Sequence, residues 1–185
     1  MTAVLLRPAE EFGDQAATIV TAERDRLRAL GVVGELVLTG GSSVAGALTR
    51  GDVDLHLRVR PAAFAGVVAL LRGTYVVVHP EIWGPTLATF AVPAALPAGM
   101  AVTPAGSEHD LRFTRTWQLL AADPALLEAY NAVKLAAGEG DRGYEDGKSA
   151  FFDQLLRLWP THPAGAAGPS SSSSSSSAAA DRSAR

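Results

Sequence analysis

The segment from Asp52 to Val59 alternates ionisable and apolar side chains without a break, and it constrains the fold more strongly than any other part of the 185 residues. Successive side chains of a β-strand point to opposite faces, so this pattern predicts a strand with one core face and one ionisable face. The core face takes Val53, Leu55, Leu57 and Val59, and the ionisable face takes Asp52, Asp54, His56 and Arg58. On this face we expect His56 to be a partner of Asp54.

Two carboxylates, Asp52 and Asp54, share that ionisable face. At a spacing of two residues they repel each other unless a cation lies between them. Mg²⁺ suits the task, because it takes one or two carboxylates and keeps coordination sites for phosphate oxygens and water. The strand alone leaves two interpretations open: a metal site, or a half-solvated strand whose acidic pair is neutralised by Arg50 or Arg58.

A glycine-rich loop, Gly40-Gly41-Ser42-Ser43, directly follows an apolar run that predicts a buried strand over Glu35–Thr39. Glycines let a backbone approach a ligand closely, and exposed N–H groups at the start of a helical turn bind anions. Taken alone, such a loop is usually only a turn. Placed ten residues before the Asp-x-Asp strand, it predicts phosphate-binding amides beside metal-binding carboxylates, as phosphoryl or nucleotidyl transfer requires.

The rest of the chain predicts an α/β (α+β) fold in which a mixed β-sheet is flanked by helices. Helical periodicity covers Pro8–Leu30 and Ala62–Arg72, and strand patterns cover Tyr75–Val78, Leu87–Val92 and Met100–Val102. Three further helices are expected over Glu108–Ala121, Pro124–Ala137 and Tyr144–Leu158. We therefore predict an α/β core over 1–105, a C-terminal helical part of the same domain over 106–159, and a disordered Ser/Ala-rich tail over 160–185.

Composition excludes several classes of function. The chain has no cysteine, which excludes disulfide scaffolds, thiolate metal sites and thiol catalysis. Its 16 basic and 19 acidic residues disfavour a nucleic acid as partner, since such binding needs a basic face. The four histidines show no metal-ligand spacing, which disfavours zinc. No apolar run approaches a bilayer span of about 18 residues, and the first residues lack a signal-peptide core, so we expect a cytoplasmic protein without membrane contact.

Gly40-Gly41, ten residues, and then Asp52-Val53-Asp54-Leu55 resembles the motif of the polymerase-beta-like nucleotidyltransferase superfamily. Within that superfamily the chain resembles the GrpB family. The family's glycine–serine loop matches Gly40–Gly46, and its two Tyr-x-x-x-Lys helices match Tyr130 to Lys134 and Tyr144 to Lys148. The resemblance spans about Leu36 to Leu156 and implies a nucleotidyltransferase-like mixed sheet.

The resemblance also implies a site and a reaction. Asp52 and Asp54 would be the catalytic acids and hold Mg²⁺, and a nucleoside triphosphate, with ATP the expected one, would be the substrate. Its binding residues would be Gly40, Gly41, Ser42, Ser43, Arg50, Lys134, Tyr144 and Lys148. The reaction would transfer a nucleoside monophosphate to a small-molecule or protein acceptor. The alternative is a non-catalytic nucleotide-binding or protein-interaction module of the same fold, because the later strands lack the superfamily's third carboxylate.

Two expectations concern the side chains around this site. Each lysine lies four residues after a tyrosine on one helix face. Lys134 and Lys148 either reach the triphosphate, with Tyr130 or Tyr144 lining the base or acceptor, or cover a packed aromatic ring at a helix seam; both interpretations stay open. Three acids, Glu81, Glu108 and Asp110, lie at the edges of predicted elements, and we expect them to be surface or capping acids.

Overall fold

The computed structural model describes residues 5–136 and 141–158, with the side chains of 141–146 and 158 left out of the description. A five-stranded mixed sheet has the strand order β2-β4-β7-β6-β5. Its strands are β2 (Gly34–Thr39), β4 (Val53–Val59), β5 (Val76–Val77), β6 (Ala88–Ala91) and β7 (Ala98–Pro104). The pair β4 and β7 is parallel and the other pairs are antiparallel. A separate two-stranded sheet joins β1 (Arg7–Pro8) to β3 (Leu48–Thr49).

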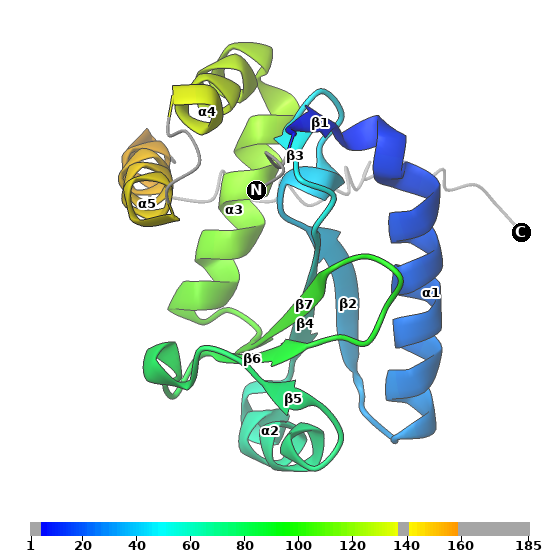
Figure 1. Ribbon diagram of the computed structural model, residues 1–185. Coiled ribbons are helices and arrows are strands. Elements are labelled where there is room, and N and C mark those ends of the chain that lie inside the picture. The colour runs from blue at the N-terminus through cyan, green and yellow to red at the C-terminus, as the bar shows by residue number, and fades with distance from the viewer. Residues whose placement is uncertain (1–4, 137–140, 159–185) are drawn as a thin grey trace, which may run out of the picture.

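Helices cover both faces of the five-stranded sheet (Figure 1). They are α1 (Gly13–Ala29), α2 (Phe64–Arg72), α3 (Glu108–Ala122), α4 (Pro124–Ala136) and α5 (Asp141–Leu158). Short 3₁₀ turns η1 (Ala9–Phe12), η2 (Gly41–Ser43), η3 (Pro61–Ala63) and η4 (Pro80–Ile82) complete the described elements. None of the helices in this part of the chain has the length and apolar character needed to cross a membrane.

The predicted core face of β4 packs against α1 and α2. Its four apolar side chains are almost fully buried and share one core cluster with Ile19 and Leu27 of α1 and Leu71 of α2. Burying apolar side chains of this size contributes about 1.5–3 kcal/mol each, which makes this layer the main source of stability. The prediction of the apolar face is therefore confirmed, with β4 beginning one residue later than expected.

The opposite face of the sheet meets α3, which fixes the position of the helical part. Arg58 donates from Nε to Asp110 Oδ1 at 2.6 Å and from Nη2 to Asp110 Oδ2 at 3.1 Å. The ring of His56 meets that of Phe113 edge-on, with centroids 5.4 Å apart. This charged and aromatic contact docks α3 on β4 and holds the helix at a set height above the sheet.

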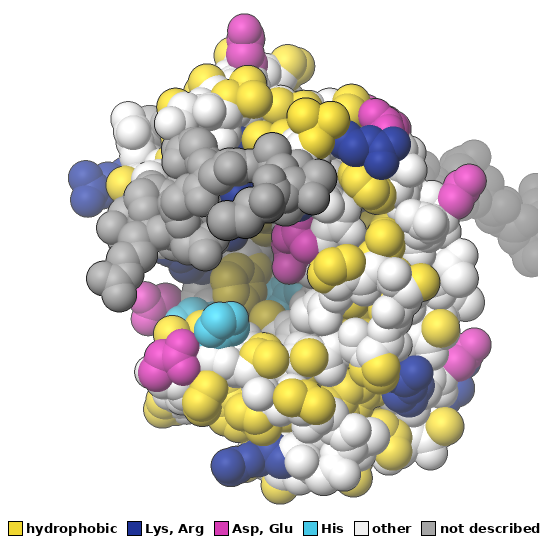
Figure 2. Space-filling view, in the orientation of Figure 1, with side chains coloured by type: hydrophobic (Ala, Val, Ile, Leu, Met, Phe, Trp, Pro, Cys, Tyr) yellow, Lys and Arg dark blue, Asp and Glu magenta, His cyan; other side chains and the backbone are white. Residues whose placement is uncertain are grey.

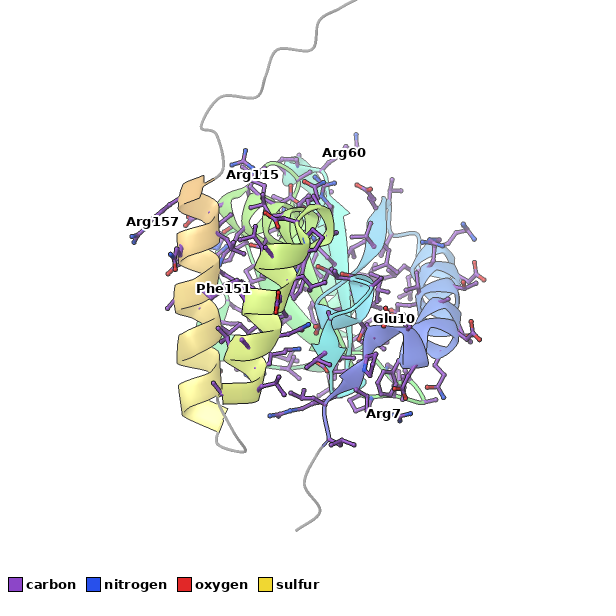
Figure 3. The ribbon with its side chains drawn as sticks, turned by 90° about the horizontal axis from the view of Figure 1, so that it is seen from above. Arg7, Glu10, Arg60, Arg115, Phe151 and Arg157 are labelled. Atoms are coloured by element: carbon purple, nitrogen blue, oxygen red, sulfur yellow. The ribbon has the colours of Figure 1, made fainter. Side chains whose placement is uncertain are left out.

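The three C-terminal helices form their own small core. Leu120 of α3, Tyr130 of α4 and Phe152 and Leu155 of α5 are its buried residues. In the view from above, α4 and α5 run side by side with Phe151 between them (Figure 3), and the rings of Phe151 and Tyr130 lie 5.9 Å apart. The predicted change from sheet to helices after Gly106 agrees with these elements, whereas the predicted tail over 160–185 lies outside the described residues.

Candidate functional site

The glycine-rich loop and the Asp-x-Asp segment meet at the end of β2 and the start of β4. Thr39, the last residue of β2, pairs with Asp54 across the sheet. Gly40 then has φ +73° and ψ −172°, a conformation that L side chains rarely adopt. An alanine Cβ at Gly40 would lie 2.0 Å from Asp54 Oδ2. The glycine is therefore required twice, by its backbone angle and by the carboxylate packed against it.

Hydrogen bonds inside this segment use the hydroxyls of both loop serines. Ser42 Oγ donates to the carbonyl of Asp52, and Ser43 Oγ donates to the carbonyl of Gly40 at 2.7 Å. Thr49 Oγ1 donates to Asp52 Oδ1 at 3.0 Å, which orients that exposed carboxylate. Both serine hydroxyls therefore shape the loop itself, and the predicted binding of phosphate by the loop's backbone amides stays a prediction.

Helix α4 holds the chain that leads from this loop to β3. Asn131 accepts from the Leu48 N–H through Oδ1 at 2.9 Å and donates through Nδ2 to the Gly46 carbonyl at 2.8 Å. Lys134 Nζ donates to the Leu48 carbonyl at 2.6 Å. From the other side, Glu10 Oε1 accepts from the Gly46 N–H at 2.6 Å (Figure 3). Asn131 was not predicted as a site residue, because the Tyr-x-x-x-Lys motif from Tyr130 to Lys134 leaves this position unspecified.

Lys134 interacts with the other charged residues that were predicted for the site. Its half-buried ammonium lies 5.1 Å from the Tyr130 ring centroid and 3.1 Å from the position that a Cβ on Gly41 would take. Burial lowers the pKa of Lys134, the carboxylates of Asp52 and Asp54 oppose that shift, and Lys148 and Arg50 add to it. Two acids and three cationic side chains from distant parts of the sequence therefore interact in one place.

A pocket of about 310 Å³ opens beside this charged group, between the sheet and the helical part. Asp54, Gly99 and Ala101 of adjacent strands line its floor, since Asp54 pairs with Gly99, and Phe113, Trp117, Lys148 and Phe152 line its walls. Figure 2 shows a hollow on this face, with hydrophobic side chains inside it and histidine and acidic side chains at its edge. The aromatic residues of this wall were not among the predicted site residues.

Gly99 lines the floor of the pocket and has no side chain that would fill it. Its backbone does not have a positive φ, and an added Cβ would meet only the Phe90 carbonyl, at an ordinary 3.8 Å. Neither the backbone nor the packing of the protein therefore requires glycine at this strand position. Because Gly99 pairs with Asp54, a larger side chain there would extend into the pocket on the same side as that carboxylate.

Several sequence-based expectations need correction. His56 is no partner of Asp54: it is buried, its Nε2 lies 2.8 Å from Thr103 Oγ1, and burial lowers its pKa to about 4. Arg58 bonds Asp110 and Glu35 and does not neutralise the Asp52–Asp54 pair. Asp110 accepts from the Gly106 N–H as a capping acid does, but it is fully buried and not a surface acid. Each error has the same cause, which is that α3 covers this half of the polar face.

Tyrosine positions also differ from expectation. Tyr130 is 1% exposed in the helical core, where it stacks on Phe152 and meets Trp117 edge-on, so it cannot line a base or acceptor. Tyr144 belongs to α5, but its side chain lies outside the described residues, so its predicted role stays a prediction. Glu81 and Glu108 are exposed, as expected.

Asp52 and Asp54 have no third acid beside them in the part of the chain that the structure describes. In the described residues, no group of three or more His, Cys, Asp or Glu side chains is placed to hold a metal ion. Asp52 and Asp54 remain the only acids that the prediction offers for a metal at this end of the pocket.

Comparison with known proteins identifies the fold. No family model and no curated protein matches the chain. A solved structure does: the conserved protein GrpB from Enterococcus faecalis matches with a TM-score of 0.63 and 12% sequence identity, covering 83% of this chain and 98% of that one. At this identity the likeness establishes the fold alone: the chain folds like that GrpB protein, and the predicted α/β fold with a mixed sheet, flanking helices and a C-terminal helical part is confirmed.

Proposed function

We propose that this chain is a GrpB-type nucleotidyltransferase that binds Mg²⁺ and a nucleoside triphosphate, ATP in the first place, and transfers the nucleoside monophosphate to a small-molecule or protein acceptor. One observation carries the proposal. The acidic pair Asp52 and Asp54 interacts with the cations Arg50, Lys134 and Lys148 at a pocket that Asp54 and Lys148 line. The rings of Phe113, Trp117 and Phe152 line another part of the same pocket. A ligand with a polyanionic end and a flat apolar end fits such a site.

The residues present fit a magnesium ion. Hard carboxylate oxygens are its preferred ligands, and two of them leave room for phosphate oxygens and water. Thr49 orients Asp52, and the Gly40 backbone packs against Asp54, so both carboxylates are held in place without the metal. When bound there, Mg²⁺ would neutralise phosphate charge and polarise the phosphorus toward attack.

The chain's own residues contribute position and charge. Lys148 lines the pocket beside Asp54, and Lys134 lies against the loop, so both can offset charge on a triphosphate. Phe113 and Trp117 offer ring surface to a base. In the proposed transfer, an acceptor oxygen or nitrogen forms a bond to the α-phosphorus while the bond to the β-phosphate bridging oxygen breaks. Pyrophosphate leaves, and the proton of the acceptor passes to water.

A second candidate function is nucleotide binding without transfer. It is favoured by the lack of a third acid near Asp52 and Asp54 among the described residues, because an acceptor hydroxyl then has no evident carboxylate to take its proton. Binding and transfer therefore have to be measured separately.

The test uses α-³²P-labelled nucleotides, Mg²⁺ and a metabolite and protein extract, with binding followed by calorimetry. Asp54→Asn removes one carboxylate charge, and Gly99→Val fills the floor of the pocket. Asp25→Asn, on the exposed surface of α1, is the matched control. We expect the wild type and the control to bind nucleotide and transfer label, and both site variants to lose at least tenfold in affinity. Gly99→Val should fold as stably as the wild type, since valine favours a strand over glycine.

The outcomes separate the two candidates. Binding without any labelled product would refute transfer and leave the binding module. Binding that is unchanged by both Asp54→Asn and Gly99→Val would place the ligand elsewhere and contradict the site. No binding of any nucleotide would refute both functions.

A further inference from the structure

The far end of the pocket from Asp54 carries a strained histidine, His79. It has φ 47° and ψ 49°, and it is the one non-glycine residue with positive φ in the described part of the chain. It also precedes Pro80, and a residue before proline normally adopts an extended conformation. A left-handed residue in this position is therefore costly, by about 1–3 kcal/mol, and persists only where its surroundings impose it.

The surrounding loop does impose it. The Val78 carbonyl accepts from Thr89 Oγ1 at 2.6 Å and from Trp83 Nε1 at 3.1 Å. The His79 carbonyl accepts from the Ile82 N–H at 3.1 Å and closes the turn η4. Arg72 covers the Trp83 ring at 5.4 Å from its centroid. These contacts fix the backbone on both sides of His79, so the exposed imidazole is presented at the pocket rim by a rigid loop.

One contact defines which ring nitrogen faces the ligand. His79 Nδ1 lies 3.3 Å from Glu81 Oε1. A carboxylate only accepts, so Nδ1 carries the proton in this contact, and in the neutral ring Nε2 is left as a hydrogen-bond acceptor. The rim of the pocket therefore offers a ligand an acceptor at this end.

The position of His79 matches one end of a nucleotide. It follows β5, and Asp54 lies on β4, with β6 and β7 between them in the sheet. Three inter-strand steps correspond to about 14 Å. A nucleotide whose phosphates bind at Asp54 and Lys148 can reach His79 only with its base. In a purine, the exocyclic group is the part of the base that extends farthest from the phosphates.

We propose that His79 selects the base of the bound nucleotide, its Nε2 accepting a hydrogen bond from the exocyclic amino group of adenine. The inference rests on the proposed function and names the base that the site prefers. The left-handed backbone of His79 then has a function, because it places the Nε2 acceptor at the rim of the pocket.

ATP and ITP test this directly, because ITP carries a 6-oxo group, an acceptor, where ATP carries the amino group. With the full chain, Mg²⁺ and calorimetry, we expect the wild type to bind ATP about tenfold more tightly than ITP. His79→Gly should abolish the preference by weakening ATP and not ITP. It should also raise the Tm by about 2–4 °C, because glycine removes the backbone strain. Glu81→Gln, which keeps an oxygen acceptor for Nδ1–H, is the control and should retain the preference.

Each result decides something. The inference is supported if His79→Gly loses the tenfold preference for ATP over ITP and also becomes more stable. A histidine that does not contact the nucleotide would not change the preference when it is replaced. Equal binding of ATP and ITP by the wild type overturns it, and so does a preference that survives His79→Gly; in both cases Asp54-dependent binding leaves the proposed function standing. If no nucleotide binds, the proposed function fails and the inference fails with it.

Discussion

Replacing Gly40 with alanine measures how closely the loop approaches the carboxylate of Asp54. The substitution has two separate costs. The first is the backbone: at φ +73° and ψ −172° the residue lies in a region that is essentially restricted to glycine, which costs alanine about 1–3 kcal/mol. The second is steric, because the new Cβ would lie 2.0, 2.7 and 2.8 Å from Oδ2, Cγ and Cβ of Asp54. Displacing a packed side chain costs about another 1–3 kcal/mol.

A second glycine separates the two costs. Gly31, after α1, has nearly the same φ, +74°, but an added Cβ there would meet nothing within 4 Å. Gly31→Ala should therefore lose only about 1–2 kcal/mol of unfolding free energy, the cost of a left-handed alanine. Gly40→Ala should lose about 2–6 kcal/mol, a large part of the stability of a domain of this size. Urea unfolding followed by circular dichroism measures both losses.

A double-mutant cycle then assigns the excess to Asp54. In an Asp54→Ala background, the clashes with Oδ2 and Cγ are absent and only the 2.8 Å approach to the Cβ of residue 54 remains. Gly40→Ala should therefore cost less there than in the wild type, with a coupling energy between the two sites of about 1–3 kcal/mol. The reasoning is refuted if Gly40→Ala costs no more than Gly31→Ala, or if the cycle shows no coupling. Either result would mean that the loop does not pack against the carboxylate, and the pocket would lose its proposed phosphate end.

Two further predictions concern buried titratable groups. Burial, opposed by Asp110 and assisted by Arg58, lowers the pKa of His56 to about 4, so the imidazole stays neutral in the fold while the unfolded chain takes up a proton below about pH 6.5. The free energy of unfolding should therefore fall by about 3 kcal/mol from this group between pH 7 and pH 4, and an identical pH slope in His56→Gln would contradict the assignment. Lys134→Met should weaken nucleotide binding at least tenfold and change stability by less than about 1.5 kcal/mol, since relief of the buried ammonium offsets the lost bond to Leu48. Asn131→Ala removes the other contact with this loop without a change of charge, and an equal loss of affinity in that variant would show that Lys134 acts by holding the loop and not by its charge.

Local patterns were sufficient to predict most of the fold. The alternation over Asp52–Val59 predicted β4 and its apolar face, and the run Glu35–Thr39 predicted β2 to within one residue. These predictions succeed because a strand's side-chain period is fixed by backbone geometry and does not depend on the rest of the chain. The two-residue strands β1 and β3 were not predicted, whereas the equally short β5 was, because it lies within the apolar run Tyr75–Val78.

The site was predicted only in part, because its residues come from segments that are distant in the sequence. The motif spacing indicated Gly40 and Asp54, whose contact depends on a short loop and a neighbouring strand. Nothing local indicated that Phe113 or Trp117 would line a pocket, because a helix pattern does not show which part of its apolar face is left unfilled. The left-handed backbone of His79 was equally hidden, since a His-Pro step normally indicates an extended residue.

The polar face of β4 shows why position along one strand decides function. Helix α3 docks over the second half of the strand, where Asp110 takes Arg58 in two hydrogen bonds and lies 3.7 Å from His56 Nε2. At the other end Asp54 lies beyond the helix contact and lines the pocket. Because the same strand carries both groups, the Arg58–Asp110 pair sets the height of α3 and of its ring Phe113 above Asp54. The Arg58–Asp110 ion pair therefore helps to set the width of the proposed nucleotide site, although neither of its members lines the pocket.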